Sequence, residues 1–427
     1  MYIKKVKLRY GKRVLEIDIP TRNLLLVADL NEVPRVPNER IEIEKAIRHP
    51  INHPGIQSLA QKGKKTLIIV DDFTRTTPAY KILPQLIKEL NKAGISNKDI
   101  RIMLAGGTHR RMKYNEVLQK IGKDNVERFE ILRHDIKAVK GKNELVNLGK
   151  TPLGTPIAVN KNVMEAEIKI SVGGIVGHPL AGWGGGAKII QPGVCGEETT
   201  WVTHWLLIEC KEQELLGVAD NPVRREIEEV AKKVGLDFIV NTIQNNKREI
   251  VGVVAGDPIK AHRKGVEIAK KVYGVKVPAK AEIVIAEAYP HDVDMWQAVK
   301  GIYAAKSVVK KGGTIILCAA CPEGISREHP ALLKYGYIPA DQVKELIKLG
   351  KMDDLVGASD CACVGELLKD VKIVLCSEIS KDDTMKLNIE YAETLQKAVD
   401  TALARYSSDA KVLVLKNAGD IVPMVSK

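Results

Sequence analysis

Residues 171–204 read SVGGIVGHPLAGWGGGAKIIQPGVCGEETTWVTH, a stretch that contains nine glycines, two histidines and one lysine. Residues 167–172, which lead into it, alternate apolar and polar side chains as a β-strand does. The glycines allow a loop to approach an anion closely, because no Cβ atom stands in the way. The stretch therefore predicts a strand that ends in an anion-binding loop, with His178, Lys188 and His204 beside it.

Two common phosphate-binding motifs do not match this loop. A Walker A loop needs G-x-x-x-x-G-K-[ST], whereas Lys188 follows Ala187 and precedes Ile189. The dinucleotide motif G-x-G-x-x-G has a different glycine spacing. His178 lies ten residues before Lys188 and His204 sixteen after it, which is too wide to define a tetrahedral metal site. A nucleoside triphosphatase is thus not expected. Binding of a phosphate group that belongs to another kind of ligand remains an alternative.

Polar side chains also follow two strands nearer the N-terminus. Residues 65–70 form an apolar, β-branched run that ends before Asp72 and Arg75. Residues 100–104 form another strand, and His109 follows it. Open α/β sheets bind ligands at the carboxyl ends of their strands. We therefore expect Asp72, Arg75, His109 and His178 to share one crevice.

A second α/β unit is predicted from residue 281 onward. Strands are expected at 282–286, 314–318 and 372–376, and a helix from Met295 carries Gln297 and Lys300 on one face. The fold class is therefore α/β, with two α/β domains, largely parallel sheets and an active site in the cleft between the domains. The expected parts are an N-terminal domain at 1–275, a C-terminal domain at 281–400, and a segment at 401–427 that is free to rejoin the first. Residues 2–19 predict a hairpin, and residues 274–280 a linker.

Length and charge restrict the class of protein. A chain of 427 residues exceeds the roughly 250–300 residues at which a single core stops growing. The net charge of +13 comes from basic residues that are spread among acidic ones, and aromatic residues make up only 4%. Nucleic-acid binding is therefore not expected, whereas a small anionic substrate suits the positive charge. No run of about 18 apolar residues and no signal peptide is seen, so we expect a cytoplasmic protein without membrane contact.

The seven cysteines do not indicate a disulfide framework, because their number is odd. Cys318 and Cys321 form a C-x-x-C pair, and Cys361 and Cys363 a C-x-C pair. A four-thiolate metal site is conceivable, but cysteine in a buried strand commonly acts as a small apolar residue. Cys195 is the cysteine expected nearest the site.

Four segments together resemble a known family. The pattern H-P-x-A-G-x-G-G-G-x-K-x-x-x-P-G at 178–193, with His204 downstream, resembles the nickel-dependent lactate racemases and their 2-hydroxyacid racemase and epimerase relatives. DDFTR at 71–75, GTHR at 107–110 and WQAVK at 296–300 agree with it in order and spacing.

The resemblance implies a racemase or epimerase, an isomerase, that inverts C2 of a 2-hydroxyacid by hydride transfer. Such a reaction needs a cofactor, because side chains do not accept hydride. The implied cofactor is a nickel-pincer nucleotide, a Ni(II)-pyridinium-3,5-bisthiocarboxylic acid mononucleotide, attached covalently at Lys188 and made by cofactor biosynthesis proteins. His204 would be the nickel ligand, and His109 and His178 the acid and base. The remaining roles implied are nucleotide binding by Asp72, Phe73, Thr74, Arg75, Gly185 and Gly186, and substrate binding by Arg75, Trp296, Gln297 and Lys300.

The chain departs from the family in one respect. Lactate racemase has a tryptophan in its second domain near the substrate, whereas all four tryptophans here lie before residue 300. We therefore expect a larger or more polar 2-hydroxyacid than lactate, such as a sugar acid or a dicarboxylate, with His291, Asp292 and Asp294 as candidates to shape the pocket. The alternative functions are a nicotinamide-dependent 2-hydroxyacid dehydrogenase and a non-catalytic nucleotide-binding protein. The sequence does not indicate the oligomeric state.

Overall fold

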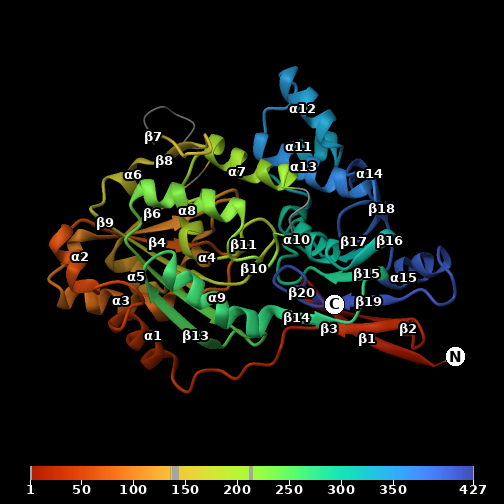
Figure 1. Ribbon diagram of the computed structural model, residues 1–427, viewed down its shortest axis with the longest axis horizontal. Helices are drawn as coiled ribbons and strands as arrows, with labels where there is room; N and C mark the ends of the chain where they lie inside the picture. The colour runs from red at the N-terminus through yellow and green to blue at the C-terminus, as the bar shows by residue number, and fades with distance from the viewer. Residues whose placement is uncertain (1, 135, 137–143, 211–214, 427) are drawn as a thin grey trace.

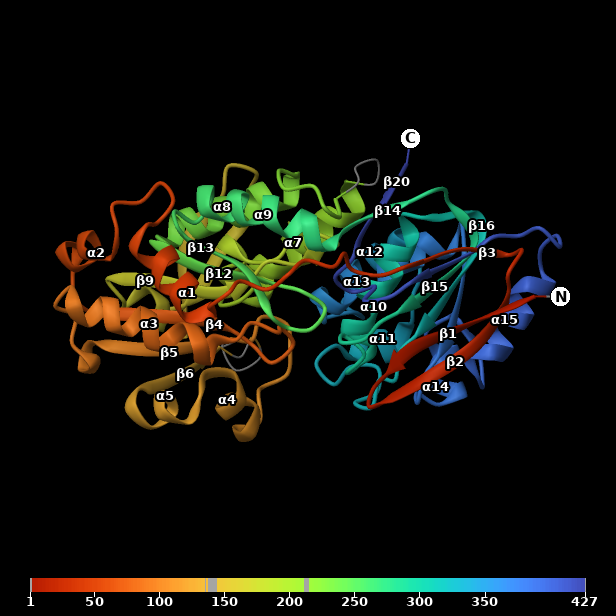
Figure 2. The ribbon, with the colours of Figure 1, turned by 90° about the horizontal axis from the view of Figure 1, so that it is seen from below.

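The computed structural model describes residues 2–134, 136, 144–210 and 215–426. It has two α/β lobes, each built on a six-stranded sheet, which lie side by side in Figures 1 and 2. The expectation of two α/β units with mostly parallel sheets is confirmed. No helix in the described ranges combines the length and the apolar character that crossing a membrane requires.

The sheet of the first lobe has the order β13-β12-β9-β4-β5-β6. Its strands are β13 (Ile250–Gly256), β12 (Phe238–Gln244), β9 (Ile168–Gly174), β4 (Thr66–Asp71), β5 (Ile100–Ala105) and β6 (Glu130–His134). All neighbours run parallel except β12 and β13. The predicted strands at 65–70, 100–104 and 167–172 correspond to β4, β5 and β9, which are adjacent in this sheet. Their carboxyl ends therefore lie together.

Alternating side chains along each strand build two cores, one on each face of this sheet. Ile68 and Val70 of β4 pack in the core that contains Ile43 and Leu83, whereas Leu67 and Ile69 pack with Val223. The period of two places successive residues on opposite faces, so both faces of a central strand must be apolar. The helices of this lobe are α1 (Glu39–Arg48), α2 (Ile56–Lys62), α3 (Ala79–Lys92), α4 (Tyr114–Ile121), α5 (Lys123–Arg128), α6 (Lys161–Met164), α7 (Glu197–Glu209), α8 (Pro222–Val234) and α9 (Lys260–Tyr273).

The second sheet is parallel throughout and has the order β18-β17-β16-β15-β19-β3. Its strands are β18 (Glu390–Tyr391), β17 (Lys372–Cys376), β16 (Val309–Cys318), β15 (Ala281–Glu287), β19 (Val412–Leu415) and β3 (Leu24–Ala28). The helices of this lobe are α10 (Met295–Lys306), α11 (Pro330–Tyr335), α12 (Ala340–Lys348), α13 (Leu355–Leu368), α14 (Lys381–Lys386) and α15 (Leu395–Ala404). One face packs on α10 and α13, and the other on α15 and the hairpin of β1 (Ile3–Tyr10) and β2 (Arg13–Pro20).

Residues 2–28 lie with the second lobe, whereas the expected N-terminal domain at 1–275 included them. The predicted hairpin is present, with its turn at Gly11, and its apolar side chains cover the sheet face that contains Ile283 and Ile316. β3 adds the edge strand next to β19 (Figure 1). The order of elements in the sequence does not decide which of two sheets a hairpin covers, because that choice depends on which face is left open.

The predicted linker at 274–280 is in part a strand, so this prediction was wrong. β14 (Gly274–Val277) pairs in parallel with β20 (Val422–Val425), and the two strands connect the lobes at the C-terminal end of the chain. The pairing joins residues about 150 positions apart, and the short polar-apolar alternation GVKV gives little sign of it. A second hairpin is formed by β7 (Leu145–Lys150) and β8 (Pro156–Asn160).

The cysteines are all free and none forms a thiolate cluster in the described chain. Cys318 and Cys376 face the hairpin core from neighbouring strands, and Cys361 and Cys363 are buried in α13. The described residues contain no group of three or more His, Cys, Asp or Glu side chains that could hold a metal ion. Cys195 is buried in the first lobe and does not line the pocket described below.

Candidate active site

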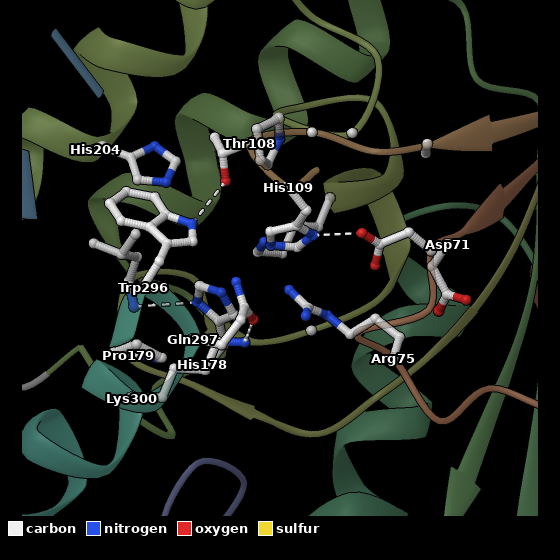
Figure 3. A pocket seen from close by; sticks show the side chains of 18 of the residues that line it. Asp71, Arg75, Thr108, His109, His178, Pro179, His204, Trp296, Gln297 and Lys300 are labelled. Atoms are coloured by element: carbon white, nitrogen blue, oxygen red, sulfur yellow. Dashed lines mark hydrogen bonds and ion pairs between the residues drawn. The ribbon is translucent and has the colours of Figure 1, made fainter. Parts of the chain in front are cut away.

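One pocket lies where the carboxyl ends of β4, β5 and β9 meet the second lobe. It encloses about 1080 Å³, part of it open to solvent, and we call it the interlobe pocket. The first lobe contributes Arg75, His109 and His178, and the second lobe contributes Gln297 and Lys300 from α10 (Figure 3). The structure thus brings together the polar residues that the sequence placed after three separate strands.

A chain of hydrogen bonds fixes His109 at the carboxyl end of β5. Its Nδ1 lies 2.6 Å from Oδ2 of Asp72, which is buried after β4. Thr74 donates its hydroxyl to Oδ1 of Asp72 at 2.6 Å and accepts a bond from Arg75 at 2.6 Å. Because a carboxylate only accepts, Nδ1 of His109 carries the proton and Nε2 keeps its lone pair. His109 is therefore set to accept a proton at Nε2.

The environment of His109 keeps its ring neutral. Burial lowers the pKa of His109 to about 4, and the Asp72 carboxylate raises it only in part. Burial would by itself raise the pKa of Asp72, but the bonds and charges of His109, Arg75 and Thr74 hold it well below its usual range. A neutral imidazole beside an ionised carboxylate is the form that a general base requires.

We expect the NMR signals of the His109 ring in the protein without cofactor to stay constant between about pH 5 and 8. The reason is that its pKa lies at about 4, below the ordinary value of about 6.5. His109→Asn assigns the signal. Asp72→Asn should move the midpoint further down, since it removes the carboxylate that raises the pKa. A midpoint near 6.5 in the wild type would contradict this assignment of the ring.

His178 lies after β9 and has the opposite arrangement of ring nitrogens. Its Nδ1 accepts from the backbone N–H groups of Leu180 and Ala181 at 3.2 and 3.3 Å. Neutral His178 therefore carries its proton on Nε2. Burial, followed by the charges of Lys188, Lys300 and Arg75, lowers its pKa well below the usual range. In the pocket, Nε2 of His109 is thus a hydrogen-bond acceptor, whereas Nε2 of His178 is a hydrogen-bond donor.

Lys188 lies in the 3₁₀ turn Gly186–Ile189 and lines the interlobe pocket. Within the described ranges, no hydrogen bond or ion pair joins its Nζ to another residue. Burial and the nearby charges of Arg75 and Arg224 lower its pKa well below the usual range. An unpaired, neutral amine that faces a pocket is the nucleophilic form of lysine.

His204 lies on α7, on the wall of the same pocket. Its Nδ1 is 2.8 Å from the carbonyl oxygen of Thr200, one turn earlier, so Nδ1 carries the proton. Burial lowers the pKa of His204 to about 4, which leaves Nε2 with a lone pair. A neutral imidazole whose other nitrogen donates to a backbone carbonyl is the usual form of a metal-ligating histidine.

The glycine-rich loop is held from behind by polar side chains. The buried guanidinium of Arg224 donates to the carbonyl oxygens of Ala181, Trp183 and Gly185, and His262 donates to that of Gly184 at 2.8 Å. Gly185 has a φ of +72°, and a Cβ there would lie 2.7 Å from the side-chain oxygen of Asn241. Glycine is therefore required where the loop turns toward Lys188.

Two of the loop N–H groups that were expected to cradle an anion are used inside the protein instead. The N–H of Gly184 bonds to Val176 at 2.8 Å, and that of Gly186 to Asn241 at 2.8 Å. These donors are used inside the protein, so they do not face an anion. The glycines serve instead to let the loop pass close to its neighbours and place Lys188 in the pocket.

Residues of the second lobe line the other side of the pocket. Lys300 donates to Oε1 of Gln297 at 2.6 Å and lies 3.4 Å from Nδ1 of His291, whose Nε2 is 2.8 Å from Asp420. The amide nitrogen of Gln297 and the remaining N–H groups of Lys300 stay available to an anion. Burial and Arg75 lower the pKa of Lys300 well below its usual range, and a bound carboxylate would favour its charged form.

Contacts between the lobes hold the loop that carries His109. Trp296 donates its indole N–H to Thr108 Oγ1 at 3.3 Å, and His329 lies 3.0 Å from the Thr108 carbonyl oxygen. Arg110 forms a two-pronged ion pair with Glu323, at 2.6 and 2.9 Å. The second lobe therefore contacts the residue on each side of His109.

Not every predicted site residue lines the pocket. Asp72, Arg75, His109, His178, Gly185, Lys188, His204, Trp296, Gln297 and Lys300 do. Phe73 and Thr74 line a neighbouring hollow with His291, and Gly186 lies behind the loop against His262. The sequence reasoning missed Tyr303, Ser359, Asp360 and Cys363, which line the pocket from α10 and α13. Only Cys363 belongs to a motif, the C-x-C pair, and no motif marks the other three, although Tyr303 continues the three-residue spacing of Gln297 and Lys300.

Comparison with known proteins matches both lobes. The lactate racemase N-terminal domain model matches residues 10–215, and the C-terminal domain model matches residues 276–422. Lactate racemases from Thermoanaerobacterium thermosaccharolyticum and Lactiplantibacillus plantarum are each 28% identical, over 98% of this chain and 98% and 99% of theirs. The lactate racemase apoprotein structure from T. thermosaccharolyticum superposes with a TM-score of 0.85 at 27% identity, covering 99% of this chain and all of that one. A Thermotoga maritima protein, 22% identical, shares the fold with a TM-score of 0.71, covering 92% of this chain and all of that one.

Two α/β lobes around a pocket with buried histidines, lysines and an arginine define the active site of an enzyme. The family models cover most of the sequence and both lobes. The chain belongs to the lactate racemase family, whose enzymes are isomerases, and it is an enzyme of the racemase class.

Proposed function

We propose that this protein inverts C2 of a 2-hydroxyacid, with His109 and His178 as base and acid and a nickel-pincer nucleotide as the hydride carrier. The observation that supports this best is the joint presence in one pocket of two oppositely set histidines, an unpaired lysine and a histidine with a free ring nitrogen. When bound, the cofactor would supply a hydride acceptor and donor, which no side chain can supply.

The residues present fit such a cofactor. Lys188 offers an unpaired amine in the neutral form that covalent attachment needs, and His204 offers Nε2 as a metal ligand. Since the described residues contain no group of three protein ligands, nickel would have to bring most of its ligands with it, as a pincer group does. Arg75 and Gly185 line the same space and would contact the nucleotide.

The protein would bind the substrate through its carboxylate and exchange a proton with its hydroxyl group. Lys300 and the amide nitrogen of Gln297 would bind the carboxylate, with Arg75 assisting. His109 would take the hydroxyl proton at Nε2 as C2 is oxidised, which leaves a planar ketoacid. For C2 to be inverted, the ketoacid must present its other face, so its oxygen moves away from His109. His178 would give that oxygen a proton from its charged ring, which it takes up from solvent as the proton on His109 is released, so that both rings end neutral.

The experiment follows a deuterium label at C2. Loaded enzyme is given single enantiomers of 2-hydroxyacids, beginning with lactate, that carry deuterium at C2, in ordinary water. We expect the inverted product to retain the deuterium, because a transferred hydride does not exchange with solvent. Chiral chromatography with mass spectrometry measures both quantities. Loss of the label to water would contradict hydride transfer, and a requirement for added NAD with release of ketoacid would indicate a dehydrogenase.

A further inference from the structure

A buried carboxyl group on the second lobe has a hydrogen bond to only one of its two oxygens among the described residues. Asp360 on α13 is 7% exposed and lines the interlobe pocket. Tyr303 of α10 donates its hydroxyl to Oδ1 at 2.8 Å. In the part of the chain that the structure describes, Oδ2 has no hydrogen-bond partner. Buried polar atoms are rarely left unpaired, so this oxygen points to a ligand with a polar group that hydrogen-bonds to it.

The position of this carboxyl group relates it to the substrate. Gln297, Lys300 and Tyr303 follow one another at three-residue spacing on α10, and all three line the pocket. A rise of about 1.5 Å per residue puts Tyr303 about 4.5 Å beyond Lys300 along the helix. A 2-hydroxyacid bound by its carboxylate at Gln297 and Lys300 would therefore reach Tyr303 and Asp360 with its third or fourth carbon.

The chemistry of the pair selects the kind of group that binds. The Tyr303 proton is already donated to Oδ1, so Oδ2 is the oxygen left for a ligand. Burial raises the pKa of Asp360 to about 7, so near neutral pH Oδ2 is present both as an acceptor and as a protonated donor. A methyl group would leave Oδ2 unpaired in either form, and a second carboxylate would bring a like charge next to the ionised form. An ammonium group is disfavoured because Arg75 and, once it binds the substrate carboxylate, Lys300 carry positive charge in the same pocket. An uncharged hydroxyl group satisfies Oδ2 without either penalty.

The pocket also has room for a longer polar side chain. A hollow of about 1100 Å³ adjoins it and continues to Lys306 and Ser307. The residues that line both spaces are Pro179, Leu207, Tyr303 and Cys363. A chain of hydroxylated carbons that passes Asp360 could extend into this hollow.

We propose that Asp360, held by Tyr303, is a specificity-determining residue that selects 2-hydroxyacids with a further hydroxyl group at C3 or C4, which are polyhydroxy acids of the sugar-acid class. This inference rests on the proposed function. It assigns the polar side chain of the substrate to α13, in the second lobe. The chain has no tryptophan after residue 300, so none lies on this helix.

The test compares substrates of equal shape on the loaded enzyme. Glycerate and 2-hydroxybutyrate differ by a hydroxyl in place of a methyl group, as do 2,4-dihydroxybutyrate and 2-hydroxyvalerate. We expect kcat/KM for inversion at C2 to favour the hydroxylated member of at least one pair by about 10²-fold. Asp360→Leu should reduce this ratio to about one, and Asp360→Asn and Tyr303→Phe should lower it in part. Ratios do not depend on the fraction of each variant that is folded and loaded. Asp341→Asn, an exposed aspartate on α12, is the control that should keep the wild-type ratio.

Four results would overturn the proposal, and they point to different causes. Equal kcat/KM within both pairs, or a ratio unchanged in Asp360→Leu, would remove Asp360 from substrate selection. A preference for malate over all hydroxylated acids would show that the group bound is a carboxylate. Inversion of no 2-hydroxyacid by nickel-loaded enzyme would instead contradict the proposed function itself, and this inference with it.

Discussion

Replacing Lys188 by alanine is expected to abolish both cofactor attachment and racemase activity. Protein made together with the cofactor's biosynthetic enzymes should carry nickel and a mass increment, and both should be absent from Lys188→Ala. We expect activity to fall by about 10³-fold or more, because the cofactor carries the redox chemistry that side chains cannot. Intact-mass spectrometry, nickel analysis and the visible spectrum measure the loading independently of activity.

Two further variants test whether attachment needs the amine of Lys188. Lys188→Arg keeps a long basic side chain but cannot offer a neutral amine, so it should also lack the increment. Lys232→Ala removes an exposed lysine on α8 and should load as the wild type does. A mass increment that persists in Lys188→Ala would place the attachment elsewhere. Wild-type protein with neither nickel nor increment would favour the dehydrogenase or the binding protein.

The parts of the fold and site that the sequence predicts are those with a local signal. β4, β5 and β9 are apolar runs followed by polar loops, and parallel strands place such loops at one edge. That reasoning is enough to place Asp72, His109 and His178 in one crevice from the sequence alone. The placement of Thr74 behind Asp72, rather than in the pocket, needed the hydrogen-bond geometry.

Other features depend on contacts between distant segments and leave little local signal. The hairpin at the N-terminus covers the second sheet, and β14 pairs with β20, because those are the surfaces left open after the sheets form. Asp360 and Tyr303 lie 57 residues apart, on different helices. Neither belongs to a motif, so their pairing appears only when α13 packs beside α10.

Replacing either His109 or His178 by asparagine is expected to stop inversion in both directions equally. General acid-base catalysis by a positioned side chain contributes about 10²–10⁴-fold, and we expect losses of kcat in this range. For a pair of enantiomers the equilibrium constant is one, and no variant can change it. The kcat/KM values of the two enantiomers must therefore fall by the same factor, which chiral assays from each side can check. His49→Asn, an exposed residue at the end of α1, should behave as the wild type.

The two variants should nevertheless differ in the first half of the reaction. If His109 and His178 stand on opposite faces of C2, each takes the hydroxyl proton of one enantiomer, which for neutral His178 requires its proton to move from Nε2 to Nδ1. His109→Asn should then still oxidise the enantiomer whose hydroxyl faces His178, and His178→Asn the other. Acid quenching of a single turnover, followed by measurement of ketoacid from each pure enantiomer, shows which oxidation survives. A complementary pattern supports two separate bases, because one shared base would lose both oxidations in the same variant. Loss of the same enantiomer in both variants would mean that the histidines act on one face, and the route to inversion would have to be sought elsewhere in the pocket.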